Sequence, residues 1–303
     1  MIMNANTVIR NMDSDNLQGP EEEKAFIKAQ ALTYRAFSHF LLVQWWGQRY
    51  DAAGNNTQLG IVIRTDNDGQ PKARSTVEEV YAQINADLDE ALTLFAGSKV
   101  TRANKANIDI NVARGIKARV LLTQGKWEAA AEMAKLVETE SGATLDPKTY
   151  ERKVGRGCDS KNSEWIWCQI AAVELGIHYY GQFYSYISNT NVSYNKNTPR
   201  CINNLLYAKI PASDVRKDLW LEDPTTMDKK DIVYPPAGNL YPWMSQKFIV
   251  CAIDNTSADY NGSLYAADVP YMRLPEMLLI EAEGYAKAGK TTDAQQALEK
   301  LAK

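Results

Sequence analysis

The chain has 303 residues, 45% of them hydrophobic, which is enough to bury a large core in one big domain or two. Its formal net charge is -3 and no basic patch stands out, which argues against nucleic acid as the main partner. No apolar run is long enough for a transmembrane helix, and the first residues lack the basic and apolar regions of a signal peptide. Because the sequence starts and stops within helical patterns, we expect a fragment that is incomplete at both ends.

The cysteine and histidine content limits the chemistry. Four cysteines occur without a C-x-x-C motif, which disfavours zinc and redox sites. They fit scattered buried thiols or, if the protein is exported, one or two disulfides. Two histidines leave little material for a metal site or a catalytic triad, so we expect no metal and no cofactor. His39 lies in an apolar helical pattern and is expected to pack in the core.

A long helix is predicted from Pro20 to Trp46. Proline suits the first helical position, and the three carboxylates that follow it favour the positive end of the helix dipole. Apolar residues occupy much of the circumference of this helix, which predicts deep burial. For the Trp45-Trp46 pair at its end we favour packing over ligand contact.

The next elements are a loop and a second amphipathic helix. Residues 48–74 are polar and rich in Gly, Asn and Asp, which predicts a long loop. Ser75 to Glu78 has the spacing of a capping box. Apolar residues at helical spacing then predict a helix that reaches Phe95.

Residues 112–137 predict two helices joined by a tight turn, and this hairpin organises the chain. Gly125 follows an apolar, helix-forming run and suits the left-handed residue that ends a helix. The same pattern returns near the end of the chain, where Gly289 takes the place of Gly125. The spacing of small residues and glycine in both copies is that of a tetratricopeptide-type hairpin. The alternative is two ordinary helical hairpins that share a glycine turn.

The middle of the chain has a different composition. Residues 158–251 contain more than half of the chain's 7 Trp and 16 Tyr residues and more than half of its 11 prolines, which disfavours long helices there. Residues 162–170 alternate in part and predict a short strand. Beyond Asp268 the chain returns to helix at Pro275.

Five blocks of sequence, in a defined order, carry a resemblance to a known family. The blocks are A-L-T-Y-R-A-F-S-H-F-L-L-V-Q-W-W-G (31–47), S-T-V-E-E-V-Y-A-Q-I-N-A-D-L-D-E-A-L (75–92), A-R-G-I-K-A-R-V-L-L-T-Q-G-K-W-E-A-A (113–130), N-S-E-W-I-W (162–167) and D-V-P-Y-M-R-L-P-E-M-L-L-I-E-A-E-G-Y-A (268–286). Together they resemble the SusD/RagB family of outer-membrane nutrient-binding lipoproteins. The resemblance covers most of residues 20–301.

The resemblance implies a mainly α fold. Its scaffold consists of tetratricopeptide-like, SusD-like helical hairpins, accompanied by an irregular, aromatic-rich segment and few short strands. We therefore expect a single SusD-like domain over residues 1–303. It should comprise a helical part at 1–145, an irregular ligand-surface segment at 146–268 and a returning helical hairpin at 269–303.

The resemblance also implies a function and a location. The protein would be a non-catalytic cell-surface binding protein that captures a glycan, an oligo- or polysaccharide, and passes it to a SusC-type TonB-dependent transporter. It would lie on the outer face of the outer membrane, held by a lipidated N-terminal cysteine that this chain lacks. Relatives of this type take polysaccharides, host-type glycans or peptides, so the nutrient stays open.

The aromatic-rich segment supplies the candidate ligand residues. Sugar rings present apolar C–H faces that stack on Trp and Tyr, while their hydroxyls need polar side chains nearby. We expect contacts in residues 179–194 and 234–243. The candidates are Tyr179, Tyr180, Tyr184, Tyr186, Asn189, Asn191, Tyr194, Trp220, Tyr241 and Trp243. Alternatively these aromatics fill a core or face the transporter, and we expect at least one of Trp165 and Trp167 to be a core residue.

Two other classes of function remain. A glycoside hydrolase needs two carboxylates that face one bond, but among 37 acidic residues a pair chosen from sequence carries no weight, and no catalytic motif is present. A peptide- or protein-binding tetratricopeptide-like adaptor would need a concave groove lined with Lys, Arg and Asn. The predicted helices are apolar on more than one face, which disfavours the adaptor.

Overall fold

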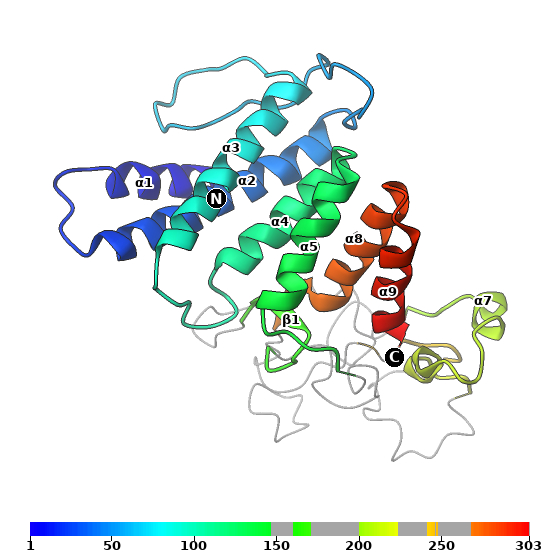
Figure 1. Ribbon diagram of the computed structural model, residues 1–303. Helices are drawn as coiled ribbons and strands as arrows, with labels where there is room; N and C mark the ends of the chain where they lie inside the picture. The colour runs from blue at the N-terminus through cyan, green and yellow to red at the C-terminus, as the bar shows by residue number, and fades with distance from the viewer. Residues whose placement is uncertain (147–159, 171–199, 224–240, 246, 248–267, 303) are drawn as a thin grey trace. The chain divides into compact units, whose positions relative to one another are not determined.

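The computed structural model describes residues 1–146, 160–170, 200–223, 241–245, 247 and 268–302 (Figure 1). The chain divides into two compact units. The helical unit is formed by Met1–Ala143 and Met272–Lys303, and the second unit is Thr144–Tyr271. None of the helices in the described ranges is long and apolar enough to cross a membrane.

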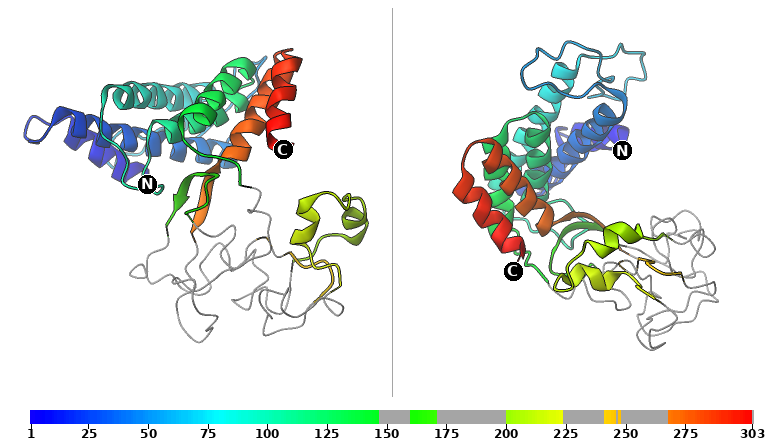
Figure 2. Two further views of the ribbon diagram at one scale, coloured as in Figure 1. Left: turned by 60° about the horizontal axis from the view of Figure 1, so that its bottom comes forward. Right: turned by 90° about the vertical axis from the view of Figure 1, so that its right-hand side faces the viewer.

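The helical unit is a succession of helices in which each one packs on the next (Figure 1, Figure 2). They are α1 (Ile2–Met12), α2 (Glu21–Trp46), α3 (Val77–Gly97), α4 (Ile110–Thr123), α5 (Trp127–Glu140), α8 (Leu274–Lys287) and α9 (Thr291–Ala302). Although α5 and α8 are far apart in the sequence, they pack directly against each other. The predicted mainly α scaffold is confirmed.

The two predicted hairpins end their first helices in the same way. Gly125 (φ 72°) and Gly289 (φ 79°) both lie in the left-handed region. Lys126 N–H donates to Leu121 O at 3.0 Å, and Lys290 N–H donates to Tyr285 O at 2.8 Å. In addition, each glycine N–H donates to the carbonyl three residues before it, Leu122 O for Gly125 and Ala286 O for Gly289. The two bonds together form the Schellman motif, which satisfies carbonyls at a helix C-terminus. The equivalent glycine turns are confirmed.

The capping box of α3 lies one residue later than predicted. Thr76, not Ser75, caps the helix: its hydroxyl accepts a hydrogen bond from Glu79 N–H at 3.2 Å, and the Glu79 carboxylate accepts one from Thr76 N–H at 2.7 Å. Ser75 is extended because its backbone pairs with Gly60 and Ile61. Since both positions fit the sequence pattern, this tertiary pairing decides between them.

The core of the helical unit lies along α2. His39 is fully buried, as predicted, and its Nε2 accepts a hydrogen bond from Arg64 N–H at 3.2 Å. Burial lowers the pKa of His39 to about 4.

The prediction for the end of α2 was wrong: Trp45 and Trp46 are 77% and 68% exposed. Most of each side chain is therefore accessible, and neither ring is part of the core.

The remaining elements in the described ranges are short and belong to the second unit, except for Met272 and Arg273 at the end of β2. β1 (Trp165–Gln169) pairs with β2 (Val269–Arg273), and α7 (Asn204–Ala208) precedes a single 3-10 turn (Val215–Leu219). The strand predicted within 162–170 is confirmed. Trp165 and Trp167 are both 2% exposed and are therefore core residues. The Trp167 ring packs edge-to-face on Tyr271 with ring centroids 4.9 Å apart.

Candidate functional site

Most of the predicted ligand residues lie outside the described part of the chain. These are Tyr179, Tyr180, Tyr184, Tyr186, Asn189, Asn191 and Tyr194. Their roles stay predictions. The three others, Trp220, Tyr241 and Trp243, are described and belong to the second unit.

Backbone pairing brings the segment of Trp220 beside the segment of Trp243, and Tyr241 lies two residues before Trp243 in the sequence. Cys201 forms an antiparallel bridge with Met244, and Trp220 forms one with Ser245. Leu221 N–H donates to Met244 O at 3.0 Å, and Ile202 N–H donates to Trp243 O at 3.0 Å. Segments that are distant in the sequence are thus held side by side. We call Trp220, Tyr241 and Trp243 the aromatic cluster.

The aromatic cluster is accessible in part. Tyr241 is 41% exposed, and Trp220 and Trp243 are half-buried. Trp243 has a φ of 64°, a left-handed conformation that is rare for a bulky residue and costs energy. Its N–H donates to Leu221 O and its carbonyl accepts from Ile202 N–H, so hydrogen bonds on both sides hold this conformation. The cluster can therefore present ring surface at a fixed place.

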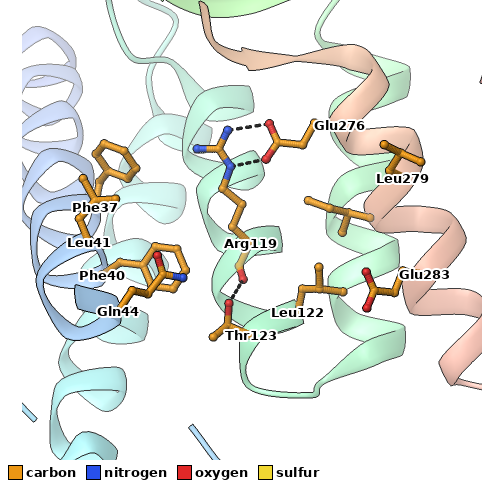
Figure 3. A pocket seen from close by; sticks show the side chains of 11 residues that line it. Phe37, Phe40, Leu41, Gln44, Arg119, Leu122, Thr123, Glu276, Leu279 and Glu283 are labelled. Carbon is orange, nitrogen blue, oxygen red and sulfur yellow. Dashed lines mark hydrogen bonds and ion pairs between the residues drawn. The ribbon is translucent and has the colours of Figure 1, made fainter. Parts of the chain in front are cut away.

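A second feature, a groove in the helical unit, was not predicted. It has a volume of about 420 Å³ and is lined by side chains of α2, α4 and α8 (Figure 3). Phe37 and Leu41 come from α2, and Leu279 comes from α8. Gln44, Thr123 and Glu283 add polar groups. We call this pocket the helical groove.

An ion pair crosses the helical groove. Arg119 of α4 donates from Nε to Glu276 Oε1 at 2.6 Å and from Nη2 to Glu276 Oε2 at 2.7 Å (Figure 3). Such a two-bond pair fixes both side chains. The two residues are 157 positions apart in sequence, and no local pattern relates them, which is why sequence reasoning missed the pair.

Comparisons with protein families match residues 1–302 of this chain in two overlapping ranges. Residues 101–302 match the family described as the SusD family. Residues 1–122 match the family described as starch-binding and associating with the outer membrane. None of the curated proteins matches this chain.

Solved structures share the fold. A SusD-like carbohydrate-binding protein from Bacteroides vulgatus is 25% identical with a TM-score of 0.77, over 99% of this chain and 58% of that protein. A SusD superfamily protein from Bacteroides thetaiotaomicron is 22% identical with a TM-score of 0.72, over 99% of this chain and 62% of that protein. A laminarin-binding SusD-like protein is 18% identical with a TM-score of 0.69, over 99% of this chain and 67% of that protein. The chain thus spans about three fifths of the length of the first two.

Proposed function

Because this chain belongs to the SusD family, we propose that it takes part in glycan capture at the cell surface without catalysis. The captured ligand is an oligo- or polysaccharide, and it passes to a SusC-type TonB-dependent transporter in the outer membrane. The protein is held at that membrane by a lipid anchor.

One observation supports the binding of sugar most directly. Backbone pairing holds the segment of Trp220 beside the segment that contains Tyr241 and Trp243, and all three side chains are partly accessible. Aromatic faces stack on the C–H faces of sugar rings, and each contact contributes on the order of 1 kcal/mol. A few such contacts give weak to moderate affinity, which suits capture followed by release. The similarity to a carbohydrate-binding protein at 25% identity agrees with this ligand class.

Alanine substitution tests the aromatic cluster. We expect Tyr241→Ala and Trp220→Ala to weaken binding to whichever glycans the wild-type protein binds on a glycan array, by about fivefold each, since one stacking contact is lost. Calorimetry with the strongest binder then measures the loss.

Tyr271 provides a matched control because it is also 41% exposed, but it lies in β2 rather than in the aromatic cluster. Tyr271→Ala is expected to leave glycan affinity unchanged. Equal affinity in Tyr241→Ala, Trp220→Ala and wild type would contradict the proposed site.

The absence of catalysis is tested separately. Incubation of pure protein with a bound oligosaccharide should leave the oligosaccharide intact over time, and chromatography measures any products. Time-dependent cleavage would contradict the proposal. The adaptor alternative is disfavoured because the helical groove is not basic: Arg119 is paired with Glu276, and Glu283 adds a further negative charge.

A further inference from the structure

The helical groove has a neighbouring pocket. A second pocket of about 390 Å³ in the same unit also has Thr123 in its wall. It is lined by Arg49 and Asp51 from the segment after α2, and by Trp127 at the start of α5. Thr123, at the C-terminal end of α4, therefore lines both pockets, and we call the two together the double pocket. Each has the volume range of a small-molecule site.

Three polar side chains that line the double pocket are available to a ligand. Gln44, Arg49 and Glu283 are exposed, and none has a hydrogen-bond or ion-pair partner among the described residues. They come from α2, the segment after it and α8. Their donors and acceptors are therefore available to hydroxyl groups of a ligand.

The double pocket also offers apolar faces at both ends. Trp127 is half-buried in the second pocket, and Lys287 Nζ lies 5.9 Å from its ring centroid. Phe37 and Leu279 line the first pocket, and Leu279 is 50% exposed. An aromatic or aliphatic face beside unpartnered polar groups is the combination that a sugar ring needs.

The charges of the lining select among glycans. Arg49 and Arg119 contribute positive charge, while Asp51, Glu276 and Glu283 contribute negative charge. Because Glu276 neutralises Arg119, no excess of positive charge remains to attract a sulfated or carboxylated sugar. The lining therefore suits an uncharged ligand.

We propose that the double pocket of the helical unit is a second carbohydrate-binding site, which takes a neutral oligosaccharide that lies across Thr123. This proposal shares its ligand class with the proposed function but uses different residues in the other unit. A second site on one chain raises the apparent affinity for a long polysaccharide, because two sites can bind the same ligand.

Fluorine NMR of fluorotryptophan-labelled protein separates the two sites. The 7 Trp signals are assigned by single Trp→Phe substitutions, and maltoheptaose, laminarihexaose and cellohexaose are the probes. We expect at least one probe to shift the Trp127 signal in a saturable way. Trp220 and Trp243 report on the aromatic cluster in the same titration.

A variant that combines Gln44→Ala, Arg49→Ala and Glu283→Ala tests the contacts. We expect it to weaken the response at Trp127 at least tenfold and to leave the response at Trp243 unchanged. Its matched control combines Gln296→Ala, Arg10→Ala and Glu299→Ala, which are the same exposed residue types elsewhere in the helical unit. The control should behave as wild type.

Each outcome decides one of the two proposals. A shift at Trp243 without one at Trp127 overturns the second site and leaves the proposed function standing. A shift at Trp127 alone supports the second site and contradicts the aromatic cluster. No shift with any probe contradicts both. If the cationic peptide acetyl-Leu-Lys-Leu-Lys-amide shifts Trp127 and the sugars do not, the double pocket binds peptide and the proposal is wrong.

Discussion

The ion pair between Arg35 and Asp87 is the most buried one among the described residues. The side chains are 8% and 2% exposed, and Arg35 donates to both Asp87 oxygens, at 2.8 and 2.6 Å. Arg35 also donates to Asn6 at 3.1 Å, so α1, α2 and α3 meet at this guanidinium. Removal of one partner leaves a buried charge without its counter-ion.

We therefore expect Arg35→Met to lower the free energy of unfolding by about 3–5 kcal/mol, as measured by urea denaturation. Arg216→Met is the control. The Arg216 side chain is 68% exposed in its pair with Asp214, and such surface pairs contribute less than about 1 kcal/mol. Equal losses in the two variants would show that burial does not control the energetics of these pairs.

Glu281 of α8 gives the stability of the helical unit a pH dependence. The residue is 2% exposed, and burial raises its pKa to about 8, with a further increase from the charge of Glu138 and a hydrogen bond with it. Lys300 and Lys135 act in the opposite direction. Between the ordinary carboxyl pKa and about 8, the folded state holds a proton that the unfolded state has lost. Stability therefore falls as the pH rises through this range.

Glu281→Gln should remove this pH dependence because an amide does not titrate. We expect the wild type to lose on the order of 3 kcal/mol of unfolding free energy between about pH 5 and about pH 8.5, and the variant to lose much less. Urea denaturation at both pH values measures the difference. Glu283→Gln, an exposed site on the same helix, should keep the wild-type slope. A wild-type slope in Glu281→Gln would assign the pH dependence to other groups.

At the scale of single elements, the two glycine turns allow a matched comparison. Both glycines have positive φ, so alanine is strained at each by about 1 kcal/mol. A Cβ on Gly125 would also lie 2.7 Å from the Cβ of Ala52, whereas a Cβ on Gly289 would meet nothing within 4 Å. We expect Gly125→Ala to lower the melting temperature more than Gly289→Ala.

Gly97 is the control for this comparison. It ends α3, has no positive φ, and a Cβ there meets nothing within 4 Å. Gly97→Ala should be neutral or slightly stabilising because alanine favours helix. If Gly289→Ala matches Gly97→Ala, the left-handed turn is not a source of strain.

The elements that sequence predicted correctly have local signals. The hairpin turns follow from apolar periodicity and one glycine each, and β1 follows from partial alternation and aromatic content. The failures depend on contacts between distant residues. Ser75 and Thr76 both fit a cap, and only the pairing of Ser75 with Gly60 and Ile61 decides.

The aromatic cluster and the helical groove also depend partly on local sequence signals and partly on contacts between distant residues. An aromatic-rich segment predicts that ring surface is available, but the bridges that gather Trp220 and Trp243 join positions with no local relation. The helical groove depends on the packing of three helices and on the pairing of Arg119 with Glu276. Likewise, the apolar character of Trp45 predicts burial, but the side chain is 77% exposed, because burial depends on the neighbours that the fold supplies and not on residue type alone.

At the scale of the whole molecule, the second unit interrupts the sequence of the helical unit. The second unit is inserted between α5 and α8, which pack against each other. A Cβ on Gly284 of α8 would lie 2.5 Å from Trp127 O and 2.9 Å from the Cβ of Ala131, so the backbones of α5 and α8 approach closely. This contact buries apolar surface within the helical unit itself.

We expect the helical unit to fold without the insertion. Replacement of residues 144–271 by a Gly/Ser linker of about ten residues should give a protein with helical circular dichroism and a cooperative thermal transition, because α8 and α9 still cover α5. A chain that ends at Ala143 is the control. It exposes Ala131, which is fully buried in the complete unit, and should melt at a lower temperature. A linked protein that melts without cooperativity would show instead that residues 1–303 fold as one domain.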